Sequence, residues 1–281
     1  MAYAFALTFS GTLFHEPIPI NFHRHSQSFA SRQISPSRDI PLPDFIALGL
    51  DYRHLVNNLG WGSLLDDAPT LVCPAAVRLF YSNLRHFGLH SRTLTSLMAG
   101  HLMMLPAADI GNLLHFPVIG ENLAAVSEFG LFNFNLAEEA ERLSGFLPGP
   151  DGTIPSLVLL PTLQVFHYFL SRVFLPRSTQ LDRITPLDVW IMNHAIAAVP
   201  LDYSQLFFGA LIPFVDHSFL APLPFAARIT ELLLALPISL SWFRTESPTL
   251  WLTADDVLDE LEIAIGGGGA SCQRDLDIRR L

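Results

Sequence analysis

Three arginines gather in the second half of the sequence and are its main candidates for binding chemistry. Arg172, Arg177 and Arg183 fall within 12 residues, with Pro176 between the first two. Guanidinium groups bind phosphates and carboxylates through paired hydrogen bonds, so the group could contact an anion or an acidic partner. Phe174 is the one aromatic residue in the run, so no platform for stacking bases accompanies it. A solvated connection between two buried helices is the simpler interpretation, and both stay open.

Two pairs of adjacent acids, Asp66-Asp67 and Asp255-Asp256, resemble the carboxylates of a metal-dependent enzyme only in composition. Two-metal catalysis needs acids that are presented together to the ions. Asp255 and Asp256 instead follow Thr253 at a predicted helix start, where negative charge is favoured. Asp66 and Asp67 precede Ala68-Pro69 in a predicted turn. We therefore assign both pairs to caps and turns.

A transposase-type triad of two aspartates and one glutamate needs acids at the ends of packed strands and one on a helix. The acids that are available lie in helical or proline-punctuated contexts and not beside strand-like segments: Asp109, Asp188, Asp202, Asp216 and Glu231. The sequence therefore predicts no catalytic residues.

Metal ligands and activated nucleophiles are not indicated either. His23 and His25 have no third ligand nearby, and a metal site needs three or four. Gly88 is expected to end the helix between His86 and His90. There is no HExxH motif and no GxSxG elbow, and Asp151-Gly152-Thr153 sits in a proline-flanked turn. We predict no metal and no cofactor.

Composition excludes further classes of function. All 16 basic residues of the 281 are Arg, so lysine-dependent Schiff-base and phosphate-loop chemistry is excluded. The formal net charge of −10 repels a phosphate backbone, which leaves nucleic-acid contact only to the local arginine group. A protein partner is the remaining expectation, and its identity is unknown from the sequence.

Cysteine content and hydropathy bear on the compartment. Cys73 and Cys272 are isolated in the sequence, which suits a reducing compartment, nuclear or cytoplasmic. Cys73 precedes Pro74 and is expected to be a small buried residue. The apolar run at Met1–Phe14 has no preceding positive charge, so no signal peptide is predicted. Prolines and polar residues interrupt the uncharged stretch Gly152–Ser171. We expect buried core helices and no membrane partner.

Apolar periodicity and capping residues predict a mainly helical chain. Asn135 is expected to cap one helix, and Thr185-Pro186-Leu187-Asp188 has the form of a cap, a first-turn proline and an early acid. The run 94–106 is expected to form a small hairpin. The predicted helices span residues 73–87, 106–116, 136–146, 163–174, 186–199, 201–215, 224–236 and 257–265.

The fold class predicted is mainly α, a multi-helix globular domain with at most one small β-hairpin. A flexible lead-in is expected over 1–40 and the helical domain over 41–243, with a division into two halves near 148–152. Residues 244–281 are expected to form a C-terminal helix and a flexible tail after the four glycines 266–269.

Two segments resemble a known family, the plant transposon protein domain family of retroelement-rich plant genomes. Residues 59–85 carry a Gly-Trp, a spacer and the core Val77-Arg78-Leu79-Phe80-Tyr81-Ser82-Asn83. The run 109–117 resembles the family's next block. Residues 166–196 resemble its helix, Leu-Pro-Arg turn and second helix. The resemblance covers roughly 45–240, and its motifs are patterns of core and turn residues.

The resemblance implies an origin in a mobile element and no catalytic residues that carry over. The resulting expectation is a non-catalytic interaction or structural module. The alternative is a DNA-processing, transposase-like enzyme whose carboxylates converge only in three dimensions.

Overall fold

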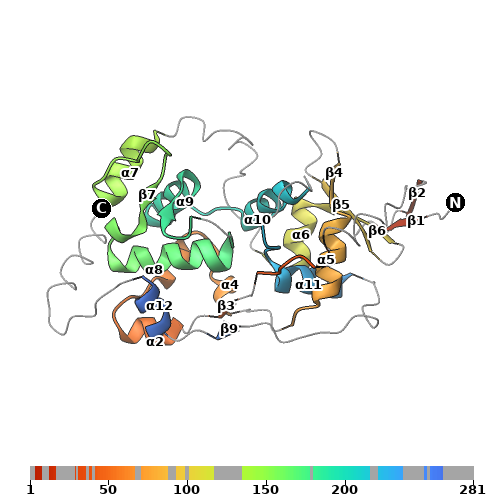
Figure 1. Cartoon of the computed structure of the whole chain (residues 1–281), viewed down its shortest axis with the longest axis horizontal. Coiled ribbons are helices and arrows are strands. Elements are labelled where there is room, and N and C mark those ends of the chain that lie inside the picture. Colours follow the sequence, from red (N-terminus) through yellow and green to blue (C-terminus); the bar gives the residue numbers. More distant parts are fainter. Residues whose placement is uncertain are drawn as a thin grey trace. The chain divides into compact units, whose positions relative to one another are not determined.

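The structure is a computed structural model that describes residues 4–7, 13–16, 29, 31–35, 38–39, 42–66, 71–87, 93–98, 101–116, 135–177, 180–215, 221–236, 250–251 and 254–261. It is mainly helical, which confirms the predicted fold class (Figure 1). The chain divides into two compact units, each built from separate segments. Unit 1 contains Met1–Ser37, Asp67–Val118 and Tyr203–Thr249, and unit 2 contains Arg38–Asp66, Ile119–Asp202 and Leu250–Leu281. The predicted division near 148–152 lies inside unit 2.

Unit 1 contains a sheet with the strand order β2-β1-β6-β5-β4, and helices α5 and α6 contact its strands (Figure 1). Strand β1 pairs parallel to β6, whereas the other neighbours are antiparallel. The elements of unit 1 are β1 (Ala4–Leu7), β2 (Leu13–Glu16), α5 (Pro74–Ser82), β4 (Arg85–Phe87), β5 (Thr93–Met98), β6 (His101–Pro106), α6 (Ala107–Leu113), α10 (Tyr203–Leu211), η4 (Ile212–Phe214) and α11 (Ala226–Ala235).

The predicted hairpin is confirmed as β5 and β6, but the limit of one small hairpin is wrong. Strand β4 extends the hairpin on one side, and β1 with β2 extends it on the other. Two further strand pairs lie in unit 2. The pairing of β1 with β6 joins segments almost 100 residues apart in the sequence, and local periodicity carries no sign of such a pairing.

The helix predicted over 73–87 is shorter than expected. Its apolar face is confirmed, since Ala76, Val77 and Phe80 are buried in α5. The helix ends at Ser82, and the Asn83 side chain donates to the Leu97 carbonyl at 2.8 Å. Residues Arg85–Phe87 then form β4 against β5. The apolar residues at the end of the predicted helix therefore serve a strand.

Part of the segment predicted as a lead-in packs into unit 1. Phe29 is fully buried, and the Arg32 guanidinium lies 5.0 Å from its ring centroid. Arg32 donates to the Ala221 carbonyl through Nε at 2.9 Å and Nη2 at 2.7 Å, while the Arg78 Nε donates to the Arg32 carbonyl. These contacts connect three distant segments of the unit.

Helix α9 lies centrally in unit 2, where it contacts α3, α7 and α8. Helix α8 is buried from Thr162 to Phe169 and continues as the π-helix η3, as expected for a run that is apolar on all sides. The elements of unit 2 are β3 (Arg38–Asp39), α2 (Leu42–Ala47), α3 (Arg53–Asn58), α4 (Ser63–Asp66), α7 (Leu136–Ser144), β7 (Ile154–Pro155), η2 (Ser156–Val158), α8 (Pro161–Phe169), η3 (Leu170–Phe174), β8 (Arg183–Ile184), α9 (Pro186–Ile196), β9 (Leu250–Trp251) and α12 (Ala254–Glu260).

Candidate functional site

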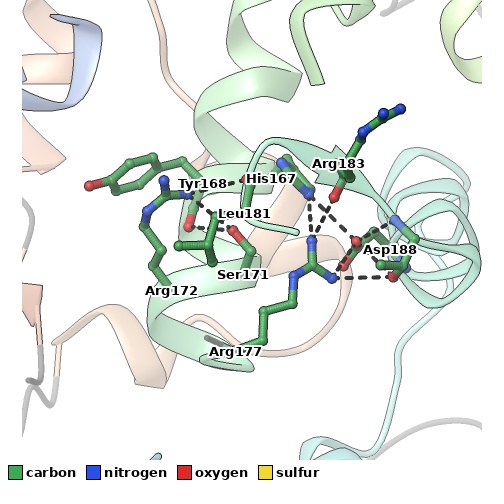
Figure 2. Close-up of polar contacts among 9 residues, drawn as sticks. His167, Tyr168, Ser171, Arg172, Arg177, Leu181, Arg183 and Asp188 are labelled. Atoms are coloured by element: carbon green, nitrogen blue, oxygen red, sulfur yellow. Dashed lines mark hydrogen bonds and ion pairs between the residues drawn. The ribbon is translucent and has the colours of Figure 1, made fainter. Parts of the chain in front are cut away.

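The three arginines proposed as an anion contact lie on consecutive parts of unit 2. Arg172 belongs to η3, Arg177 follows that helix, and Arg183 belongs to β8. Figure 2 shows that their guanidinium groups do not converge: Arg177 faces Asp188, Arg172 lies over Tyr168, and the Arg183 side chain extends away from both. Of the three, only Arg177 enters a buried polar group, which we call the Arg177 cluster: His167, Arg177, Thr185 and Asp188.

Arg177 connects three elements of the chain, α8, β8 and α9, through one guanidinium group. Its Nη1 donates to Asp188 Oδ2 at 2.7 Å and to Thr185 Oγ1 at 3.2 Å. Its Nη2 donates to the Arg183 carbonyl at 2.8 Å and lies 3.0 Å from His167 Nε2. The side chain is 23% exposed, so most of the charge is removed from water. A charge so placed needs a close counter-ion, which Asp188 supplies.

Asp188 serves as both a helix cap and the counter-ion of Arg177. The Thr185 side chain accepts from the Asp188 N–H, and Asp188 Oδ2 accepts from the Thr185 N–H at 2.7 Å, which completes a capping box at the start of α9. Burial acts to raise the pKa of this carboxyl. The nearby His167 and Arg177 side chains and the Thr185 N–H outweigh that effect and hold the pKa below its usual value.

His167 lies between the charged groups of Arg177 and Asp188. A guanidinium nitrogen can only donate, so the contact of 3.0 Å runs from Arg177 Nη2 to His167 Nε2. His167 is fully buried, and its Nδ1 has no hydrogen-bond partner among the residues that the structure describes. Nε2 lies 3.5 Å from Asp188 Oδ2, beyond a normal hydrogen bond. The ring therefore lies against both the guanidinium of Arg177 and the carboxylate of Asp188.

Arg172 and Arg183 have different surroundings. The Arg172 guanidinium carbon lies 4.1 Å from the Tyr168 ring centroid, a cation–π geometry that also covers the ring (Figure 2). Arg183 lies close enough to Asp151 for its positive charge to help lower the pKa of that carboxyl, after the larger effect of hydrogen bonds from Thr153. Contact of Arg172 and Arg183 with an anion or a partner stays a prediction.

Local sequence patterns revealed only half of the Arg177 cluster. The cap formed by Thr185 and Asp188 is confirmed as predicted. His167 is one of the polar residues that interrupt the uncharged stretch 152–171, and no local pattern predicts its contact with Arg177 or the pairing of Arg177 with Asp188. The available signal was the combination of an isolated histidine in a fully buried helix with an arginine just after it, since buried polar groups require partners.

The remaining candidate residues form turns, helix starts and parts of the core. Asp151 accepts from the Thr153 N–H and hydroxyl at 3.1 and 2.8 Å, which confirms the predicted turn. Asp255 and Asp256 lie exposed in the first turn of α12, as expected for caps. Cys73 is buried at the start of α5, and its N–H donates to Thr230 Oγ1 at 2.9 Å.

Metal ligands do not gather within the described ranges, where no group of three or more His, Cys, Asp or Glu side chains could hold an ion. His86 belongs to β4, so the helix expected there is wrong. Asp66 ends α4, and Asp109 and Glu231 lie on α6 and α11. Other candidates lie outside the described residues: His23, His25, Asp67, His90, Asp216, Thr253, the glycines 266–269 and Cys272.

Among the helices that the structure describes, none has the length and apolar character needed to cross a bilayer. Comparison of the chain with protein-family models, with curated proteins and with solved structures finds no match.

Proposed function

We propose that this chain is a non-catalytic interaction or structural module derived from a plant mobile element. The proposal rests on the resemblance of residues 59–85 and 166–196 to the plant transposon protein domain family, and on the roles of those residues in the fold. A nuclear or cytoplasmic location belongs to the same proposal and rests on the isolated cysteines.

The residues that carry the resemblance support the fold of each unit. The Trp61 Nε1–H donates to the Leu201 carbonyl at 2.7 Å inside unit 2, and the Tyr81 hydroxyl donates to the Pro224 carbonyl at 2.8 Å inside unit 1. Burial raises the pKa of Tyr81 well above its usual value, so the hydroxyl stays protonated and keeps donating. These are the roles expected of an architectural motif.

The single observation that carries the proposal is the engagement of the Asp188 Oδ2 atom inside the fold. This acid belongs to the second family-like segment, and its Oδ2 accepts from Arg177 Nη1, the Thr185 N–H and the Thr185 hydroxyl. A carboxylate that ligates a catalytic metal needs oxygen lone pairs directed at the ion. Asp188 Oδ2 is instead occupied by Arg177 and by Thr185 at the start of α9, which favours a structural role.

The test is an assay for DNA processing by the purified full chain. Supercoiled plasmid and end-labelled duplex DNA are incubated with the protein and Mg²⁺ or Mn²⁺, and we expect neither cleavage nor strand joining. Metal-dependent cleavage that is lost in Asp109→Asn, Asp188→Asn or Asp202→Asn would establish the enzymatic alternative. Circular dichroism of each variant separates a lost activity from a lost fold.

A further inference from the structure

We propose that the Arg177 cluster is a pH-sensitive switch, in which a proton taken up by His167 exchanges its contact with Arg177 for one with Asp188. One ring nitrogen faces both groups: His167 Nε2 lies 3.0 Å from Arg177 Nη2 and 3.5 Å from Asp188 Oδ2 (Figure 2). Imidazole is the side chain whose ordinary charge change falls between about pH 5 and pH 8. The switch is independent of the interaction function proposed above.

The two contacts of His167 Nε2 need opposite states of that nitrogen. The Arg177 guanidinium can only donate, so the bond from Nη2 requires a lone pair on Nε2. An ion pair with Asp188 requires a proton on Nε2, since a carboxylate only accepts. A ring that carries both protons has no acceptor nitrogen left and repels the guanidinium. Proton uptake therefore breaks the contact with Arg177 and makes the contact with Asp188.

Asp188 is the counter-ion that receives the protonated ring. Burial acts to raise its pKa, but the nearby His167 and Arg177 side chains hold the pKa below its usual value, so the carboxylate stays ionised between about pH 5 and pH 8. Asp188 Oδ2 already accepts from Arg177 and Thr185. The switch therefore exchanges one cationic donor for another at this oxygen, and the buried carboxylate is never left without a counter-ion.

Arg177 is the member of the cluster that can leave it. Its side chain is 23% exposed, whereas the side chains of His167 and Asp188 are buried. The displaced guanidinium therefore reaches water without crossing the core. Its departure breaks the bonds to the Arg183 carbonyl and the Thr185 hydroxyl. The chain reversal between η3 and β8 then loses its connection to α8.

Other titratable groups on the elements around α8 lie elsewhere. Helix α8 packs against η2, which has no titratable residue, and against η3 and α9. Arg172 of η3 lies over a tyrosine ring, and the side chain of Arg183 in β8 extends away from the cluster (Figure 2). His194 of α9 binds a carbonyl of its own helix, and the Tyr52 ring packs two residues further along α8. Within the described ranges, the cluster itself supplies the charges that face His167.

The direct test is nuclear magnetic resonance of the full chain with ¹⁵N in the histidine rings. As the pH falls from about 8 to about 5, the His167 Nε2 signal is expected to change from that of an acceptor to that of a protonated nitrogen. Two amides report the consequence, since the Ser156 N–H donates to the Asp182 carbonyl at 2.9 Å and the Arg183 N–H to the Gln180 carbonyl at 3.2 Å. Their protection from hydrogen exchange, relative to an unstructured peptide at the same pH, should fall about tenfold.

His167→Gln keeps a polar side chain that takes up no proton, so the protection of these amides should no longer depend on pH. His194→Gln is the matched control, because it removes another partly buried histidine of unit 2, and it should leave the pH dependence unchanged.

The inference is overturned if His167 Nε2 keeps one state over the whole range, or if the protection of the two amides does not change with pH. It is also overturned if His167→Gln keeps the pH dependence of the unsubstituted protein, or if His194→Gln abolishes it. If His167→Gln does not fold, the Nε2 signal of the unsubstituted protein decides alone.

Discussion

The N-termini of α7 and α9, both in unit 2, use nearly the same local chemistry in opposite surroundings. In α7, Asn135 accepts from the Glu138 N–H at 3.4 Å, and the Glu138 side chain accepts from Asn135 Nδ2 at 3.2 Å, all of it exposed. In α9, the reciprocal bonds of Thr185 and Asp188 are built into the interior, where the Asp188 side chain is 3% exposed. One cap orders a surface helix, and the other also holds a buried charge.

The comparison shows how burial changes the consequence of a helix cap. An exposed cap contributes about 1 kcal/mol or less, because water can replace either partner. The buried cap cannot lose a partner so easily, since a carboxylate without a counter-ion in the interior is strongly unfavourable. The same sequence pattern therefore produces a cap that contributes little to stability at Asn135 and one that contributes much more at Thr185.

The largest effect is expected from Arg177→Ala. This change leaves the buried Asp188 carboxylate without its guanidinium partner and should lower the free energy of unfolding by about 3 kcal/mol, measured by urea denaturation. The double variant Arg177→Met/Asp188→Leu removes both charges and should be less destabilised than Arg177→Ala. If the single and double variants are equally stable, the ion pair is not what makes the two caps differ.

The second prediction concerns pH. Asp188→Asn should lower the free energy of unfolding by about 2 kcal/mol at neutral pH through loss of charge-assisted hydrogen bonds. Because folding lowers the pKa of Asp188, this stabilisation is complete above the unfolded-state value of about 3.9 and is lost as pH falls through the lower folded-state value. The difference between the two proteins should therefore shrink in acid.

The pH measurement has an internal control. Glu141→Gln removes an exposed carboxylate of α7 and should stay within about 0.5 kcal/mol of the unsubstituted protein. The difference in free energy of unfolding between the unsubstituted protein and Asp188→Asn could instead stay constant down to the pH at which the protein unfolds. That result would argue that the ion pair is not the source of the difference.

Thr185→Ala should have an intermediate effect, about 1–2 kcal/mol, because it removes the cap of α9 and one acceptor of Arg177. Thr185→Ser keeps the hydroxyl and should recover most of the loss. Thermal denaturation followed by circular dichroism measures both. An alanine variant as stable as the serine variant would show that the hydroxyl contributes little here.

Asn135→Ala should have the smallest effect, about 0.5 kcal/mol, because water can satisfy the exposed N–H groups at the start of α7. Hydrogen exchange of the first-turn amides of α7 is the more sensitive measurement, and these amides should exchange faster in the variant. A loss as large as that of Thr185→Ala would remove the distinction between exposed and buried caps.

Features that depend on neighbouring residues were predictable from the sequence. The caps at Asn135 and Thr185, the buried α8 and the β5–β6 hairpin all follow from local spacing and are present. The end of α5 was missed, because Arg85–Phe87 are drawn into a strand by pairing with β5. Tertiary pairing can override a helical pattern of apolar residues.

The candidate site shows the same limit. The bond from Arg177 to Asp188 spans a chain reversal of 11 residues, and the contact with His167 joins that reversal to α8. No residue spacing specifies which arginine of three will turn inward. The general requirement that buried charges be paired indicates only that one of the three arginines turns inward.

The segmented make-up of the two units has a consequence for synthesis on the ribosome. Unit 1 lacks α10 and α11 until residue 235 has emerged, and unit 2 waits for β9 and α12, which end at Glu260. Neither unit can therefore finish folding until most of the chain has been made, whereas the first of two consecutive domains can fold early in translation. A nascent chain that stops at the Pro148–Gly152 turn would leave both units open, with apolar surfaces available to chaperones.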